Sequence, residues 1–232
     1  MSYNFSPRII TDGLVLYLDA ANSRSIVSGS TIWTDLSRNN NNGTLVNTVT
    51  FNGSNGGNVV FNGVTTNYIQ TNYIFAGSSS YSIGVWAKST SSGVTNRLLG
   101  NADSTSGLNG TDIIWGYPTS TQLYVVRRAG SNDAIRDTST SAISNLLTTM
   151  HHVFVTYDHT GVGTKIFVDG IQAGQNTTLG FSSTLSFRIG KDGNGTDSFN
   201  GSVYSVQIYN RALSTSEVLQ NYNATKSRFG LI

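Results

Sequence analysis

Residues 185–224 read LSFRIGKDGNGTDSFNGSVYSVQIYNRALSTSEVLQNYNA, and this stretch decides the fold of the chain. In 185–189 and again in 204–209, apolar residues alternate with polar ones, which is the periodicity of a half-buried β-strand. The residues between the two runs are mainly Gly, Asn, Asp and Ser, a composition typical of a loop. The stretch therefore predicts two strands joined by a loop.

A helix is predicted directly after the second strand. Ser214 stands three residues before Glu217, which is the spacing of a capping box, where each side chain binds the other residue's backbone N–H. Leu213 and Val218 flank the box at the positions of a hydrophobic staple. We expect one short helix over 214–223.

A β-hairpin is predicted around Asp169-Gly170, because both residues tolerate the positive φ angles of a two-residue type I′ turn. This turn would pair Val168 with Ile171 and Ile166 with Ala173, which keeps four apolar residues on one face. Strand signals recur along the rest of the chain at the spacing of a β-sandwich. Strands are expected at 14–18, 44–46, 58–62, 66–71, 81–88, 96–101, 111–116, 121–127, 134–137, 151–158, 164–168, 171–174, 185–190 and 202–210.

Several segments together resemble laminin-G-like jelly-roll domains of the concanavalin A-like lectin/glucanase superfamily. They are 185–224, His151 to Asp158 (HHVFVTYD), 165–171 (KIFVDGI), 13–19 (GLVLYLD), 33–44 (WTDLSRNNNNGT) and 60–63 (VFNG). The resemblance implies an all-β, two-sheet antiparallel jelly-roll sandwich with one short C-terminal helix. The layout of the whole chain is also similar to virion structural proteins of tailed bacteriophages.

Composition favours one domain over residues 1–232, with an N-terminal arm at 1–10 and a C-terminal tail at 225–232. Only 11% of the residues are charged, which is low for a soluble protein and typical of many short strands with polar turns. The formal net charge of +2 is too small to indicate a nucleic-acid partner. No apolar run reaches the roughly 20 residues of a membrane span, so no membrane contact is expected.

The absence of cysteine excludes disulfides, thiolate metal sites and cysteine nucleophiles. The N-terminal sequence MSYNFSPRIITDG lacks the charged and apolar regions of a signal peptide. We therefore expect synthesis in a host cytoplasm, and the similarity to phage virion proteins implies a final location in the virion.

An enzymatic role is not expected. The resemblance implies that glucanases of the superfamily use paired glutamates, and a retaining mechanism needs two carboxylates about 5 Å apart. Glu217 is the one glutamate of the chain, and the capping box already accounts for it. His151 and His152 are adjacent in a predicted strand, so they point to opposite faces and cannot chelate a metal together. We expect one of them to be packed and the other exposed.

No cofactor is expected, and calcium is the case that needs argument. The family resemblance implies a calcium-binding aspartate in the last strand, at the position that Tyr204 occupies here. Loss of one carboxylate weakens a site for Ca²⁺, which prefers several hard oxygen ligands. The loop from Asp192 to Asp197 is an alternative location for such a site, and equally an ordinary turn.

Two groups of residues are candidate contacts. Trp115, Tyr117, Tyr124 and Arg127 flank the loop at Pro118 and form either a platform for a glycan or partner, or ordinary core packing. Trp86, by contrast, is expected in the core.

The second group lies in the tail, where Lys226, Arg228 and Phe229 are candidate assembly contacts. The tail either completes the domain itself or, as we expect, docks on a neighbouring subunit.

The function expected from these features is that of a non-enzymatic virion structural protein, in a phage head, tail or fibre. The alternative is a carbohydrate-binding module that recognises a host surface glycan. The partners expected are accordingly other virion proteins, further copies of the chain, and a surface glycan.

Overall fold

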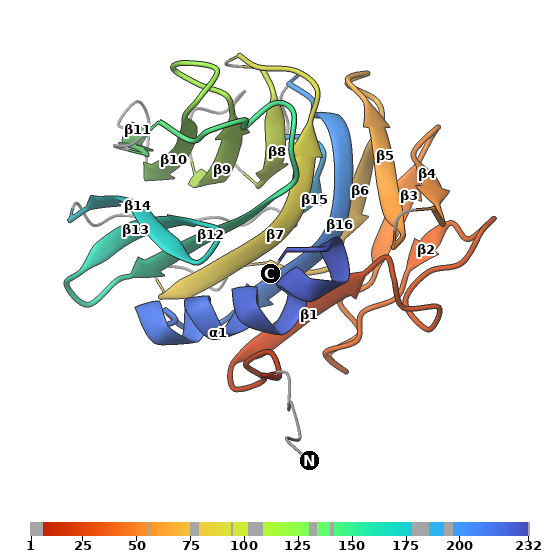
Figure 1. Ribbon diagram of the computed structural model, residues 1–232, viewed down its shortest axis with the longest axis horizontal. Helices are drawn as coiled ribbons and strands as arrows, with labels where there is room; N and C mark the ends of the chain where they lie inside the picture. The colour runs from red at the N-terminus through yellow and green to blue at the C-terminus, as the bar shows by residue number, and fades with distance from the viewer. Residues whose placement is uncertain are drawn as a thin grey trace.

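The computed structural model of the chain describes residues 7–54, 56–74, 79–93, 95–101, 109–129, 134–139, 142–177, 186–192 and 197–231, with the backbone alone at 109, 127–129 and 134–138. Within these ranges, two antiparallel sheets face each other and one α-helix lies across the outside of one of them (Figure 1). None of the described helices is long and apolar enough to cross a membrane.

Sheet A, the sheet beneath the helix, contains eight strands. Seven of them follow the order β14 (Ile171–Asn176), β13 (Gly163–Val168), β12 (His151–Asp158), β7 (Tyr81–Ser89), β16 (Asn200–Tyr209), β5 (Asn58–Asn62) and β4 (Thr50–Asn52). The eighth, β1 (Leu14–Asp19), pairs with the second half of β16.

Sheet B also contains eight strands. Their order is β11 (Ala134–Thr138), β10 (Leu123–Ala129), β9 (Asn109–Trp115), β8 (Arg97–Gly100), β15 (Arg188–Ile189), β6 (Tyr68–Thr71), β3 (Gly43–Val46) and β2 (Ile32–Trp33). Neighbours in this sheet come from distant parts of the sequence, as β15 lies between β8 and β6. The all-β jelly-roll sandwich expected from the sequence is confirmed.

The helix is confirmed as α1 (Thr215–Thr225), followed by the 3₁₀ turn η1 (Lys226–Phe229). Both halves of the predicted capping box are present. The Glu217 amide donates to Ser214 Oγ over 3.3 Å, and the Ser214 amide donates to Glu217 Oε2 over 2.8 Å. Leu213 and Val218 lie together in one buried apolar cluster, as the predicted staple requires.

The Asp169-Gly170 hairpin is confirmed in its turn and corrected in its register. Both residues have positive φ, 52° and 80°, and Val168 faces Ile171 as expected. A β-bulge between Ile166 and Phe167 then shifts the pairing by one residue, so that Ile166 faces Gly174 and not Ala173. Two other differences are the short strands β2 and β4, which the sequence pattern did not indicate, because two or three residues carry no periodicity.

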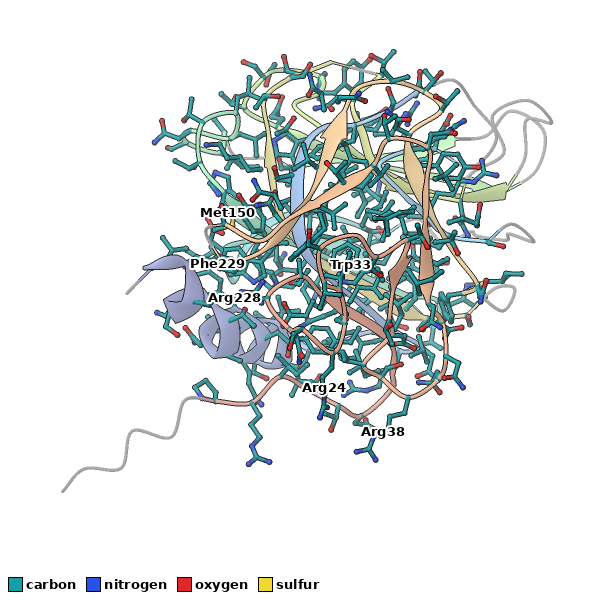
Figure 2. All side chains as sticks on the ribbon, turned by 90° about the vertical axis from the view of Figure 1, so that its right-hand side faces the viewer. Arg24, Trp33, Arg38, Met150, Arg228 and Phe229 are labelled. Atoms are coloured by element: carbon teal, nitrogen blue, oxygen red, sulfur yellow. The ribbon has the colours of Figure 1, made fainter. Side chains whose placement is uncertain are left out.

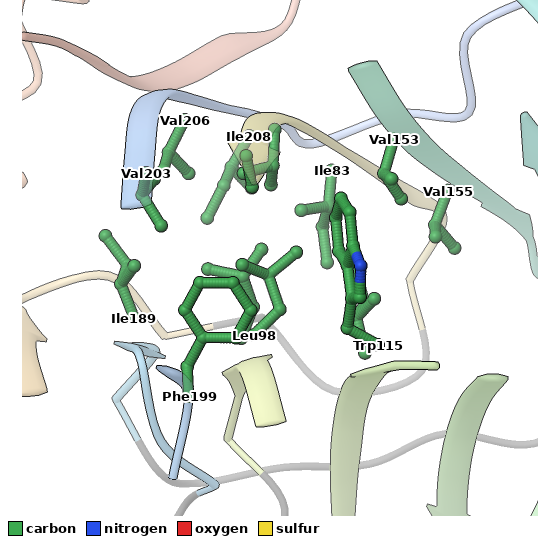
Figure 3. Packing of buried hydrophobic residues seen from close by; sticks show 14 of the residues in the cluster. Ile83, Leu98, Trp115, Val153, Val155, Ile189, Phe199, Val203, Val206 and Ile208 are labelled. Atoms are coloured by element: carbon green, nitrogen blue, oxygen red, sulfur yellow. The ribbon is translucent and has the colours of Figure 1, made fainter. Parts of the chain in front are cut away.

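The core fills the space between the sheets. Figure 3 shows Ile83, Val153, Val155, Val206 and Ile208 of sheet A facing Leu98, Trp115, Ile189 and Phe199 across this layer. Every one of these residues is 1% exposed or less. Because side chains alternate along a strand, the residues between them point outward, and these outward faces are where a ligand can bind.

Candidate functional site

The outer face of sheet A is covered by the C-terminal helix and tail. Trp86 is buried, as the sequence predicts, but it is directed to this side and not into the layer between the sheets. Its ring stacks on Tyr222 of α1 and lies 4.6 Å from the ring centroid of Phe229. Its indole Nε1 donates to Thr225 Oγ1 over 2.8 Å. This face is therefore an internal interface of the domain.

The tail lies against its own domain, which corrects the expectation of a tail that reaches a partner. Arg228 pairs with Asp19 of β1 through its Nη1, and Phe229 packs edge-on against Tyr204 of β16. Lys226 Nζ lies 5.6 Å from the ring centroid of Tyr222. Figure 2 shows Arg228 and Phe229 beside the helix, whereas Arg24 and Arg38 extend away from the molecule. The physical reason is that Trp86 and Tyr204 present aromatic surface that Phe229 covers.

The outer face of sheet B carries a row with four polar side chains. The register places Leu45, Ile69, Ile189, Leu99, Ile113 and Val125 opposite one another across six strands, and these residues belong to the core or pack against it. The adjacent row therefore points outward. It consists of Thr44, Gln70, Arg188, Gly100, Asp112 and Val126.

A buried ion cluster lies in the middle of this face. Arg97 of β8 is 6% exposed, and its Nε lies 3.0 Å from Asp197 Oδ2 while its Nη1 lies 3.5 Å from Asp112 Oδ2. Gly100 leaves the space for the Asp112 carboxylate, because a Cβ at position 100 would lie 2.1 Å from Asp112 Oδ1. One guanidinium thus contacts two carboxylates.

Two further cations flank the cluster on the side of β6. The Arg188 guanidinium carbon lies 4.9 Å, and Lys191 Nζ 5.2 Å, from the ring centroid of Tyr68. Arg188 also donates from Nε to Gln70 Oε1 over 2.8 Å. Gln70 is fixed in turn, since its Nε2 donates to the Thr71 carbonyl over 3.0 Å. Tyr68, Gln70, Arg188 and Lys191 are all partly exposed, and we call these four residues the cationic patch.

The predicted aromatic platform is only partly assembled. Trp115 is fully buried in the core and donates from its Nε1 to the Leu146 carbonyl over 2.9 Å, so it cannot contact a ligand. Tyr124 is on the opposite side of the sheet, where it packs edge-on against the half-buried Tyr117. The reason is the strand period, because Trp115 and Tyr124 occupy positions of opposite orientation in β9 and β10. The side chain of Arg127 lies outside the described residues.

The histidine pair points to opposite faces, as predicted, but both rings are buried, which corrects the expectation that one is exposed. His151 is held by two contacts, from Nδ1 to Asp169 Oδ2 at 2.8 Å and from Nε2 to Thr149 Oγ1 at 2.9 Å. His152 stacks on Trp86 on the other side of the sheet. Each histidine therefore has a packing role.

The carboxylates near the N-terminus of α1 do not form an acid–base pair. Glu217 and Asp158 line the same hollow of about 250 Å³. Hydrogen bonds from Arg211, and further ones from Ser214, lower the pKa of Glu217 to about 2. Hydrogen bonds from Thr160 also lower the pKa of Asp158. A glycosidase needs one carboxylic acid that is still protonated, and both groups here are ionised at neutral pH.

The residues present do not fit the calcium site that the fold family implies. Tyr204, at the position where the family resemblance implies a carboxylate, is packed against Phe229. Arg97 already contacts Asp197, which is one of the two aspartates of the alternative loop site, and residues 193–196 of that loop lie outside the described residues. In the described ranges, no three acidic or histidine side chains come together as a metal site would require.

An apolar hollow lies at the edge of sheet A. It measures about 340 Å³ and is lined by Ala20, Ala21, Ser23, Ile26, Val27, Ser28, Phe51, Gly53, Gly56 and Gly57. None of these lining residues is charged, and the polar groups they offer are two hydroxyls and the backbone. The cationic patch is chemically the more distinctive surface.

Comparison with known families and structures gives the following matches. The sequence model of a laminin-G-type family, described as "Concanavalin A-like lectin/glucanases superfamily", matches residues 61–219. No curated protein matches the sequence significantly.

Similar solved structures include domain 4 of AbnA, an extracellular arabinanase from Geobacillus stearothermophilus, in complex with arabinotriose (TM-score 0.69, 20% identity, 90% of this chain and 98% of that one). The binding domain of Paraclostridial Mosquitocidal Protein 1 is also similar (TM-score 0.67, 18% identity, 92% and 52% covered). A mutant sialidase of Trypanosoma rangeli matches over 97% of this chain but 35% of its own (TM-score 0.62, 20% identity). At these identities the likeness concerns the fold.

Proposed function

The chain belongs to the concanavalin A-like lectin/glucanases superfamily, and we propose that it acts as a non-enzymatic carbohydrate-binding domain whose ligand lies on the outer face of sheet B. The observation that carries this proposal is the contrast between the two outer faces. Helix α1 and Phe229 cover the aromatic side chains of sheet A, whereas sheet B leaves the hydrogen-bonding side chains of Thr44, Gln70 and Arg188 at least partly exposed.

The chemistry of this face suits a sugar. Carbohydrates are bound through planar hydrogen-bonding groups and aromatic rings, and Gln70, Arg188 and Tyr117 supply groups of these kinds. Thr44, at the exposed end of the row, adds a hydroxyl. The arabinotriose complex of a similar domain supports the proposal, because it shows that a sandwich of this fold holds an oligosaccharide.

A glycan array probed with the purified full chain tests the proposal. We expect binding to at least one oligosaccharide class and loss of that binding in Gln70→Ala, which removes a partner of Arg188. The matched control is Gln172→Ala, an exposed glutamine on β14 of the other sheet. Binding that survives Gln70→Ala and Tyr117→Ala alike would place the ligand elsewhere, and the hollow beside Phe51 would be the next surface to test.

The virion role is a second proposal, which rests on the similarity of the sequence layout to phage structural proteins. In this proposal the domain is made in the host cytoplasm and is carried on the particle, among other virion proteins or copies of itself, where it displays the glycan-binding face. Mass spectrometry and immunogold labelling of purified particles test it. Absence of the chain from particles that contain the other structural proteins would contradict it.

A further inference from the structure

We propose that the glycan recognised by this face carries a carboxylate, and that Arg188 and Lys191 bind this group. The inference rests on the proposed function and names its ligand class, an acidic sugar such as a uronate or a sialate, in place of a neutral one.

Arg188 presents a fixed guanidinium with an open end. Its Nε donates to Gln70 Oε1, and Gln70 is held by its own hydrogen bond to the Thr71 carbonyl. The terminal nitrogens Nη1 and Nη2 have no hydrogen-bond partner in the described part of the chain. A carboxylate accepts two parallel N–H bonds from such a fork, and little side-chain entropy is lost because the fork is already oriented.

Lys191 adds a second positive charge beside the same ring. Its ammonium and the Arg188 guanidinium both lie within about 5 Å of the Tyr68 ring centroid. Neither cation forms an ion pair with a carboxylate of the described residues. The ring of Tyr68 thus contacts both cations and helps to orient them.

The nearby carboxylates leave this positive charge accessible. Asp112 and Asp192 are each 1% exposed, and Asp112 contacts Arg97. Asp197 is 23% exposed in its side chain and also contacts Arg97, through that residue's Nε. The charges that a ligand meets at the surface are therefore mainly those of Arg188 and Lys191. Charge complementarity favours an anionic ligand at this position.

The test is an array of carboxylated oligosaccharides in which each glycan stands beside its methyl ester, followed by isothermal titration calorimetry with the full chain. We expect each bound acid to lose at least about tenfold in affinity on esterification, because a charge-assisted pair of hydrogen bonds is removed. Arg188→Gln should give a similar loss, and Arg188→Lys an intermediate one, because it keeps the charge without the fork. Added salt should lower the affinity of the protein for the acidic glycans more than its affinity for their esters.

Lys165→Gln, a half-buried lysine on β13 of the other sheet, is the matched control and should leave affinity unchanged. Circular dichroism of each variant verifies the fold. If neutral glycans or the esters bind as tightly as the acids, or if Arg188→Gln has no effect, the inference is wrong while the proposed function stands. If sulfated analogues bind as well as the carboxylated ones, carboxylate recognition is overturned. If no glycan of any charge binds, the proposed function itself fails.

Discussion

At the scale of single residues, His152 shows how strongly an environment can suppress a charge. The imidazole is fully buried and lies among the rings of Trp86, Phe154 and Tyr222. Burial lowers the pKa of His152 to about 3, and the nearby Asp169 charge opposes this shift only in part. The histidine is therefore neutral in the folded domain at any pH above about 3.

This shift predicts acid sensitivity. Between about pH 6.5 and pH 3 the unfolded chain binds a proton at His152 that the folded chain does not, so the free energy of unfolding falls as the pH falls. His152 alone contributes a change in unfolding free energy of about 1.4 kcal/mol per pH unit in this range. The unfolding free energy, measured by urea denaturation at several pH values in this range, should change less steeply with pH for His152→Phe than for the unmodified chain. Phenylalanine keeps a ring at this position but cannot titrate. An equal reduction in the control His159→Gln would contradict the assignment.

Gly100 is a position where one methyl group decides the local structure. Its Cβ would lie 2.1 Å from Asp112 Oδ1 and 3.1 Å from Asp192 Cα, so Gly100→Ala must displace the carboxylate that faces Arg97. We expect a loss of about 1–3 kcal/mol in unfolding free energy, as for other overpacked sites. Gly161→Ala, which meets nothing within 4 Å, is the control in the same urea titration. A loss no larger than that of the control would show that the cluster adjusts freely.

At the scale of elements, α1 depends on its first turn. Ser214 Oγ caps the Glu217 amide, and Glu217 accepts hydrogen bonds from both terminal nitrogens of Arg211. Ser214→Ala should therefore cost about 0.5–2 kcal/mol, measured as a lower midpoint in thermal denaturation followed by circular dichroism. Ser227→Ala, an exposed serine in η1, serves as the control. Unchanged stability in Ser214→Ala would mean that the packing of Leu213 and Val218 alone fixes the helix.

At the scale of the whole molecule, the C-terminal tail forms part of the domain. Phe229 lies 4.6 Å from Trp86 and 5.5 Å from Tyr204 between ring centroids. Phe229→Ala should lower the unfolding free energy by about 1–3 kcal/mol, less than for a fully buried Phe because this ring is half-buried. The tryptophan emission should also shift to the red as Trp86 becomes hydrated. Leu231→Ala, 36% exposed, is the control, and an unaltered spectrum in Phe229→Ala would contradict this packing.

The whole domain is also predicted to be stable without calcium. Tyr204 stands where the family resemblance implies a calcium ligand, and Arg97 places a positive charge between Asp112 and Asp197. Addition of EDTA should leave the melting temperature nearly unchanged, and added Ca²⁺ should not restore any loss. A large drop on chelation would overturn this prediction and direct attention to Asp192 and Asp197.

Features set by near neighbours in the chain could be predicted from the sequence. The alternation around Ile208 defined a strand, the spacing of Ser214 and Glu217 defined a helix start, and Asp169-Gly170 defined a turn. Each depends on backbone geometry over a few residues, so the pattern alone determines it. The same patterns, assembled along the chain, determined the fold class.

Only the tertiary structure decided which side chains meet. Arg188 and Gln70 are 118 positions apart and become neighbours because β15 inserts beside β6. Trp115 is buried in the core between the sheets, whereas Trp86 lies beneath the tail. In both strands the side chains alternate between the two faces of the sheet, so the sequence pattern does not distinguish the two tryptophans. A period of two assigns residues to two faces but does not say which face is covered, because that depends on strand order and on where the helix and tail pack. The strands could therefore be predicted from residues close together in the chain, whereas the cationic patch forms only when the strands assemble into the sheet.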